Sequence, residues 1–227
     1  MKRIAFNAFA HAALLALLCA HAAGQTGVQQ PPPPPPSPQP AVNVGTITDS
    51  AYVNEYFGLR LMIPEGWNVY DAQGRQMVLE RGRKMITSSD KSVQAGLDAA
   101  ASRTVNLLTV TKLPQGQSGM ANAVFGCGAE MLAGSGVKTG EEYLAAMKKL
   151  LPYAQAAFQV EEDVGSENIN GMDFGVLTLK VEGPGGTVRQ KYYAVAKRDY
   201  ALFCISTYTN DADRLLMTKA VSSISFR

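Results

Sequence analysis

Histidine is almost absent from this sequence. The 227 residues contain two histidines, His11 and His21, and both lie in an N-terminal apolar segment with the form of a removable export signal. A chain that has lost this segment has no imidazole for Ser-His-Asp or Cys-His catalysis and none for a His-ligated zinc site. We therefore expect no catalytic residues, no bound cofactor and no metal ligands in the mature chain.

Excess charge of one sign is also lacking. The chain has 21 Lys and Arg against 19 Asp and Glu, and two of the basic residues, Lys2 and Arg3, belong to the N-terminal segment. The remainder is formally neutral. A neutral domain has no basic face of the size that nucleic acid requires, so we expect no nucleic-acid partner.

The N-terminus has the pattern of a secretory signal peptide. The two basic residues precede an apolar run over residues 12–20, and small residues follow. This predicts a signal peptide over residues 1–24, cleaved between Ala22 and Gly24. The apolar run is shorter than the roughly 20 residues that cross a bilayer, and no later run is longer than a strand. We expect an exported protein, periplasmic or secreted, with no transmembrane segment after cleavage.

A lipoprotein signal is the alternative for this segment. Cys19 would then be the lipidated residue. Lipoprotein processing favours a small residue just before the cysteine, and Leu18 is bulky, so the motif fits poorly.

Proline is concentrated in one stretch after the leader. Eight of the twelve prolines lie between residues 31 and 40. Proline fixes φ and lacks an N–H, so this run is expected to be an extended polyproline II segment. We predict a disordered Pro-rich linker over residues 25–48 that spaces the domain, with docking into an aromatic groove as the alternative.

The remainder, residues 49–227, is predicted to be one globular domain. Alternating apolar residues over 57–63 predict a strand that ends at Pro64. A second strand is predicted at 77–79, fading at 81–84. A helix is expected over 88–101, with Ser88 or Ser89 as its cap, and a further strand over 105–112.

The second half of the domain has clearer signals. Thr139 and Glu142 form a capping-box pattern before a helix that Pro152 should end near Leu151. Three strands over 177–181, 188–196 and 200–208 predict an antiparallel meander. Asn210 or Asp211 then caps a final helix. This order of elements predicts an α+β layered sandwich.

The segment Tyr52–Trp67 resembles the opening of PsbP-like domains, in which an aromatic-Gly strand runs into Pro-x-Gly-Trp. The meander Met172–Tyr208 and the ending Ser223–Arg227 are also similar to that family, so the resemblance covers about residues 50–227. It implies an α/β/α sandwich around a central antiparallel sheet.

Members of this family include the extrinsic protein of the photosynthetic oxygen-evolving complex, a Ran-binding nuclear transport factor of the Mog type, and bacterial secreted proteins. They act largely by binding and assembly, and the resemblance supplies no active site. The Pro-rich segment and an insertion over 84–101 depart from the plant form and speak against a photosystem role.

Two cysteines, Cys127 and Cys204, lie outside the leader. In an exported chain they could form one disulfide. Alternatively, Cys204 is a small buried core residue in the middle of a strand. A thioredoxin-type redox pair is not expected, because its cysteines would be nearly adjacent.

Two groups of side chains are candidates for a binding surface. The basic cluster Arg81, Arg83 and Lys84 could meet an anionic lipid, a cell-wall polymer or an acidic partner, and a solvated strand end is the plainer interpretation. Tyr192 and Tyr193 would contribute if they face outward, whereas half-buried strand tyrosines are the alternative.

Three adjacent acids, Glu161, Glu162 and Asp163, are candidates for acid–base chemistry or calcium binding. Glycosidase chemistry needs two carboxylates across a substrate gap, and calcium needs six to eight oxygens. Three consecutive acids show neither pattern, and a solvated charge run is the simpler interpretation.

The sequence as a whole favours a non-enzymatic exported envelope protein of PsbP-like fold that binds a protein or cell-envelope component. One alternative is a histidine-free hydrolase that uses carboxylates or a Ser-Lys pair, with Lys148 and Lys149 as candidate lysines. Another alternative is a carrier of a small apolar ligand held between helix and sheet.

Overall fold

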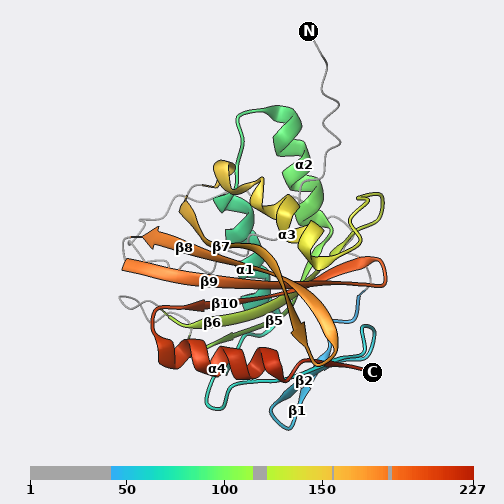
Figure 1. Ribbon diagram of the computed structural model, residues 1–227, viewed down its shortest axis with the longest axis vertical. Coiled ribbons are helices and arrows are strands. Elements are labelled where there is room, and N and C mark those ends of the chain that lie inside the picture. The colour runs from blue at the N-terminus through green and yellow to red at the C-terminus, as the bar shows by residue number, and fades with distance from the viewer. Residues whose placement is uncertain (1–41, 115–121, 155, 184–185) are drawn as a thin grey trace.

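The computed structural model describes residues 42–114, 122–154, 156–183 and 186–227 (Figure 1). The predicted signal peptide, the proline run at 31–40 and the lipidation candidate Cys19 lie outside the described residues. The Pro-rich linker was predicted to extend to residue 48. The structure instead has Val42 buried and a strand at 46–48, so the folded part begins before residue 49.

Eleven strands, four α-helices and one 3-10 helix occur in the described part of the chain. In chain order they are β1 (Thr46–Thr48), β2 (Ala51–Asn54), β3 (Leu59–Met62), β4 (Asn68–Val69), α1 (Ala72–Met85), α2 (Lys91–Ser102), β5 (Thr104–Thr111), β6 (Val124–Met131), α3 (Gly140–Lys148), the 3-10 helix η1 (Leu151–Tyr153), β7 (Ala157–Ile169), β8 (Met172–Gly183), β9 (Gly186–Lys197), β10 (Tyr200–Tyr208), α4 (Asp211–Ser222) and β11 (Ser225–Phe226).

The strands form two antiparallel sheets. The larger has seven strands in the order β4-β5-β6-β10-β9-β8-β7, and the smaller has four in the order β1-β2-β3-β11. Helices α1, α2 and α3 cover one face of the large sheet, whereas α4 and the small sheet lie on the other face (Figure 1). This is an α+β fold with a C-terminal meander followed by a helix, as predicted.

Each face of the large sheet has its own apolar core. On the α1–α3 side, Leu144 and Met147 of α3 pack with strand residues such as Phe203. On the α4 side, Met217 and Val221 pack with the small sheet and with β5, β6 and β10. A sheet covered on both faces buries its central strands completely, which is why β5 and β10 are buried at every position.

Helix α3 begins where its backbone meets the sheet. The Thr139 hydroxyl accepts a hydrogen bond from the Glu142 amide at 3.1 Å, and this is the first half of the predicted capping box. The Glu142 carboxylate accepts from the Lys138 amide, one residue before the cap. Gly140 is required here, because a Cβ at this position would lie 1.8 Å from the Ala194 carbonyl oxygen.

The strand predicted at residues 77–79 is wrong, since these residues lie in α1. Asp71 caps this helix by accepting from the Gly74 amide at 2.7 Å. Gln76, Glu80 and Arg83 then interact at helical spacing on the exposed side. Apolar alternation over three residues could not reveal these longer-range helical pairs.

Other boundaries also differ from the sequence prediction. The cap of α2 is Asp90 rather than Ser88 or Ser89, whereas Asn210 caps α4 as predicted, by accepting from the Asp213 amide at 2.9 Å. Strand β6 was not predicted. This strand contains two glycines and is buried on both faces, so its sequence lacks the alternation of apolar and polar residues that marks a half-exposed strand. No helix in the described ranges has both the length and the apolar character that crossing a membrane would require.

Candidate functional site

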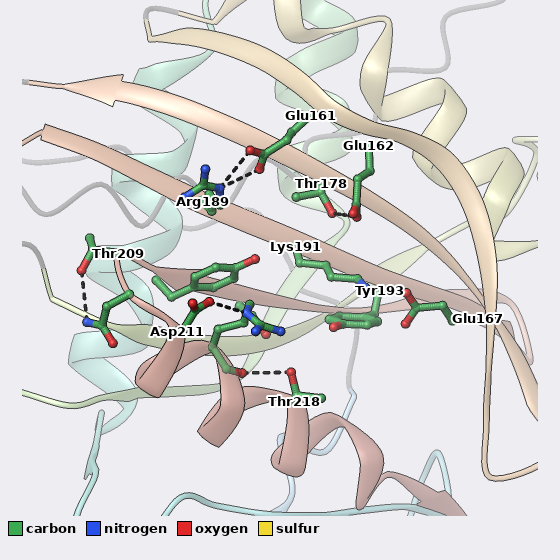
Figure 2. Close-up of a pocket in the computed structure, with 14 residues that line it drawn as sticks. Glu161, Glu162, Glu167, Thr178, Arg189, Lys191, Tyr193, Thr209, Asp211 and Thr218 are labelled. Carbon is green, nitrogen blue, oxygen red and sulfur yellow. Dashed lines mark hydrogen bonds and ion pairs between the residues drawn. The ribbon is translucent and has the colours of Figure 1, made fainter.

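A polar trough lies on the α4 side of the large sheet (Figure 2). Strand β7 supplies one wall through Glu161, Glu162 and Glu167. Helix α4 supplies the other wall, which includes Arg214 and Thr218. Strands β8, β9 and β10 form the floor. The trough encloses about 560 Å³, which is within the size range of small-ligand sites.

Strand pairing places four polar side chains in one row across the trough. Glu162 is opposite Thr178, Thr178 is opposite Lys191, and Lys191 is opposite Ser206. Tyr193 lies on the same face as Lys191, two residues along β9. Since side chains alternate along strands, this face is fixed once the strand register is set.

The β7 wall is fastened to α4 at one end of the trough. The side-chain amide of Asn170, in the turn between β7 and β8, donates to the carbonyl oxygens of Ser222 at 2.8 Å and Ile224 at 2.7 Å. These contacts hold the β7–β8 hairpin against the C-terminal end of α4.

Two arginines of the trough are paired through Nε. Arg189 Nε donates to both carboxylate oxygens of Glu161, at 3.0 and 2.8 Å. Arg214 Nε donates to Asp211 Oδ1 at 2.9 Å. The carboxylates raise the pKa of each guanidinium, chiefly through these hydrogen bonds, so both arginines stay charged.

Lys191 and Glu162 complete the set of charges. Lys191 Nζ pairs with Glu167 and lies 5.3 Å from the centre of the Tyr193 ring. Glu162 accepts a hydrogen bond of 2.6 Å from the Thr178 hydroxyl, and no ion pair of Glu162 occurs in the described ranges. Every cation of the trough therefore has a carboxylate partner, and Glu162 is the carboxylate that has no cation.

Three hydroxyl groups of the floor have no partner among the described residues. The Ser206 hydroxyl is buried without a hydrogen bond, and none is made by the hydroxyls of Tyr193 and Tyr208. Burial raises the pKa of both tyrosines above the ordinary value, with a smaller contribution from Glu167 at Tyr193. Both phenols therefore stay protonated at neutral pH and can donate hydrogen bonds.

The structure separates the residues that the sequence suggested as a binding surface. Arg81, Arg83 and Lys84 are exposed on α1, which lies on the opposite face of the sheet from the trough. Tyr192 is 0 % exposed and packs in the α1–α3 core, so its assignment to a surface is wrong. Tyr193 points to the other face and lines the trough.

The three adjacent acids do not act as one cluster. Irregular pairing between β7 and β8 on either side of Glu162 lets both Glu161 and Glu162 line the trough. Asp163 pairs instead with Lys148 of α3 at 2.7 Å, and this hydrogen bond lowers the pKa of the Asp163 carboxyl. No three His, Cys, Asp or Glu side chains in the described ranges are placed together so that they could hold a metal ion.

Cys127 and Cys204 are joined by a disulfide. They face each other across β6 and β10, with a Cα–Cα distance of 4.1 Å. Both are buried in the core beneath α4. The disulfide joins β6 to β10, which is a floor strand of the trough, and Cys204 lies two residues before Ser206.

A buried acid on the other face was missed by sequence reasoning. Glu130 of β6 is 2 % exposed and accepts a hydrogen bond of 2.9 Å from the Tyr143 hydroxyl. Burial raises the pKa of Glu130 to about 8, against smaller lowering effects from Tyr143 and Arg103. The signal in the sequence was a single acid inside a stretch of apolar and small residues.

Comparisons with known proteins give distant similarities. No family model matches the sequence, and no curated protein matches it. The chain is similar to the solution structure of cyanobacterial PsbP (CyanoP) from Synechocystis sp. PCC 6803, with a TM-score of 0.44, 10% identity, and coverage of 81% of this chain and 96% of that one.

Two other solved structures are similar to this chain. LpqN of Mycobacterium tuberculosis, involved in cell envelope biogenesis, has a TM-score of 0.35 and 12% identity, and the match covers 74% of this chain and 83% of that one. A protein of unknown function, PA94, from Pseudomonas aeruginosa has a TM-score of 0.39 and 14% identity, over 55% of this chain and 81% of that one. Similarities this distant say nothing about activity or partners.

Proposed function

We propose that this protein is a non-enzymatic binding module of the cell envelope and that the polar trough is its binding site. The observation that carries this proposal is a concave site whose three cations are each paired with a carboxylate and whose remaining carboxylate, Glu162, is oriented by the Thr178 hydroxyl. Such a site offers oriented donors and acceptors to a partner.

The state of the candidate catalytic groups supports binding rather than catalysis. Lys148 pairs with Asp163, Lys149 is exposed, and neither lysine lines the trough. The trough tyrosines stay protonated, and both described cysteines are in the disulfide. These arrangements do not favour a hydrolase with a Ser-Lys pair. Glu161 and Glu167 are each paired with a cation, which does not favour two free carboxylates on the β7 wall.

The lining of the trough also bears on the apolar-carrier alternative. Carboxylates, cations and hydroxyl groups dominate it. An apolar ligand would remove these groups from water and would offer no hydrogen bonds in place of those to water, which is unfavourable.

Export to an oxidising compartment is part of the same proposal. The leader pattern supports export, and the disulfide between Cys127 and Cys204 is of the kind that persists outside the cytosol. The Pro-rich segment would then space the binding domain from the surface of the envelope.

The test is comparative capture from the native cells. The full chain is crosslinked in place beside three variants: Glu162→Gln with Arg214→Gln in the trough, Arg81→Gln with Lys84→Gln on α1, and Glu141→Gln as an exposed control on α3. We expect a partner that is lost with the trough variant and kept with the other two.

Loss of the partner only with the α1 variant would show that the partner binds at the basic cluster and not at the trough. Equal recovery of the partner with all variants would exclude the trough as its binding site. Turnover of a substrate by the purified chain, with no partner recovered, would refute the binding role itself.

A further inference from the structure

We infer that the polar trough binds an extended peptide segment that presents an ammonium group and a carboxylate about four residues apart, the ammonium at Glu162 and the carboxylate at Arg214. This inference rests on the proposed function and specifies the chemistry of the ligand.

The β7 wall supplies the site for the positive group. The Thr178 hydroxyl, on a residue that is 4 % exposed, fixes Oε2 of Glu162 at 2.6 Å. The other carboxylate oxygen, Oε1, has no partner in the described ranges. An ammonium group would give this carboxylate its missing counter-charge through a charge-assisted hydrogen bond.

The α4 side supplies the site for the negative group. Arg214 is bound to Asp211 through Nε, and its two Nη groups have no partner among the described residues. The Asp211 side chain is 85% exposed, so this surface pair contributes little and costs little to rearrange. A planar guanidinium edge suits a carboxylate.

Two hydroxyl groups of the trough floor support the same assignment. The Tyr208 hydroxyl stays protonated and has no partner in the described part of the chain, so it can donate to an oxyanion. The Ser206 hydroxyl is buried on a residue that is 3 % exposed and is also without a partner. A buried hydroxyl without a hydrogen bond is unfavourable until a ligand atom satisfies it.

The separation of the two groups defines the length of the ligand. Glu162 and Ser206 lie at the two ends of one row of paired residues across β7, β8, β9 and β10. Helix α4, which carries Arg214, packs on β10, and Arg214 and Ser206 line the same trough. Three strand spacings amount to roughly 14 Å. An extended peptide of about four residues covers that distance.

The paired charges between these ends exclude a ligand of a single sign. A polyanion would face the carboxylates of Glu161 and Glu167, and a polycation would face Arg189 and Lys191. A ligand with one charge of each sign meets its opposite at both ends and leaves the two central pairs intact.

The experiment uses tetra-alanine in four forms: free, N-acetylated, C-amidated and blocked at both ends. Binding to the full chain is measured by calorimetry at millimolar peptide. We expect saturable binding of the free peptide, weakened about fivefold or more by either block. Glu162→Gln should weaken binding of the free peptide by the same factor, but it should not further weaken binding of the N-acetylated peptide. Arg214→Gln should also weaken binding of the free peptide, but it should not further weaken binding of the C-amidated peptide.

Glu141→Gln, on the other side of the sheet, is the matched control and should change nothing. No saturable binding of free tetra-alanine, equal binding of the free and blocked peptides, or tighter binding of spermine or inorganic phosphate would overturn the inference. If the trough variants still lose the partner in the capture experiment, the proposed function stands without this ligand. If they lose neither partner nor peptide, both proposals fail.

Discussion

Glu130 should make the stability of this protein depend strongly on pH. Its carboxyl group is buried beneath α3, and burial raises its pKa from the ordinary 4.5 to about 8. Below the ordinary value the group is protonated in both the folded and unfolded chains. As the pH rises towards 8, the unfolded chain ionises while the folded chain keeps the proton, so the folded state loses stability.

The size of this loss follows from the difference between the two pKa values. Each pKa unit corresponds to about 1.4 kcal/mol, so the full window from 4.5 to about 8 corresponds to roughly 5 kcal/mol. Because small domains are stable by only about 5 to 15 kcal/mol, a change of this size is a large fraction of the total.

The variant Glu130→Gln should remove this dependence. Glutamine has nearly the same shape, its carbonyl oxygen can still accept from the Tyr143 hydroxyl, and it does not ionise. We expect the free energy of unfolding of the variant, relative to the native chain, to increase steadily from about pH 5 to about pH 8. Glu141→Gln, at an exposed position of α3, should follow the native curve.

Urea unfolding at a series of pH values measures this difference. Trp67 is the single tryptophan and lies in the core on the α4 side, so its fluorescence reports global unfolding. If the free-energy difference between the native chain and Glu130→Gln stays constant to within about 0.5 kcal/mol across this window, Glu130 ionises normally in the folded state. That result would refute the assignment of a buried protonated acid.

Three further predictions concern the scaffold. Reduction of the Cys127–Cys204 bond, which spans 77 residues, should lower the free energy of urea unfolding by roughly 4 kcal/mol, and an unchanged midpoint would contradict this. Gly140→Ala should lower the free energy of unfolding by about 3 kcal/mol, because the new Cβ forces α3 away from the sheet. Gly165→Ala is the control, since a Cβ there meets no atom closer than 3.9 Å, and it should change the free energy of unfolding by no more than about 0.5 kcal/mol. Asn170→Ala should cost about 2 kcal/mol and speed amide hydrogen exchange at the β7–β8 turn, and unchanged exchange would show that this contact does not fasten the wall.

The trough could be predicted from the sequence only in part. Glu161 and Glu162 were identified as a charged run, and Tyr193 as a tyrosine that contributes to a surface if it faces outward. The pairing of Glu161 with Arg189 of β9 depends on strand register, and the position of all three residues in a trough with Arg214 of α4 depends on helix packing. Strand register and helix packing both involve residues far apart in the chain, so no short sequence motif predicts the site.

Elements with local signals can be predicted from the sequence. Capping residues such as Thr139 and Asn210, and the turn-separated alternation of the C-terminal meander, act within a few residues, and the structure contains the corresponding helices and strands. Other features depend on how the layers pack. This packing made residues 77–79 helical, placed β6 beside β10 so that Cys127 meets Cys204, and buried Glu130. The physical reason is that burial and cross-strand contacts join residues far apart in the chain, so their energies exist only once the layers have packed.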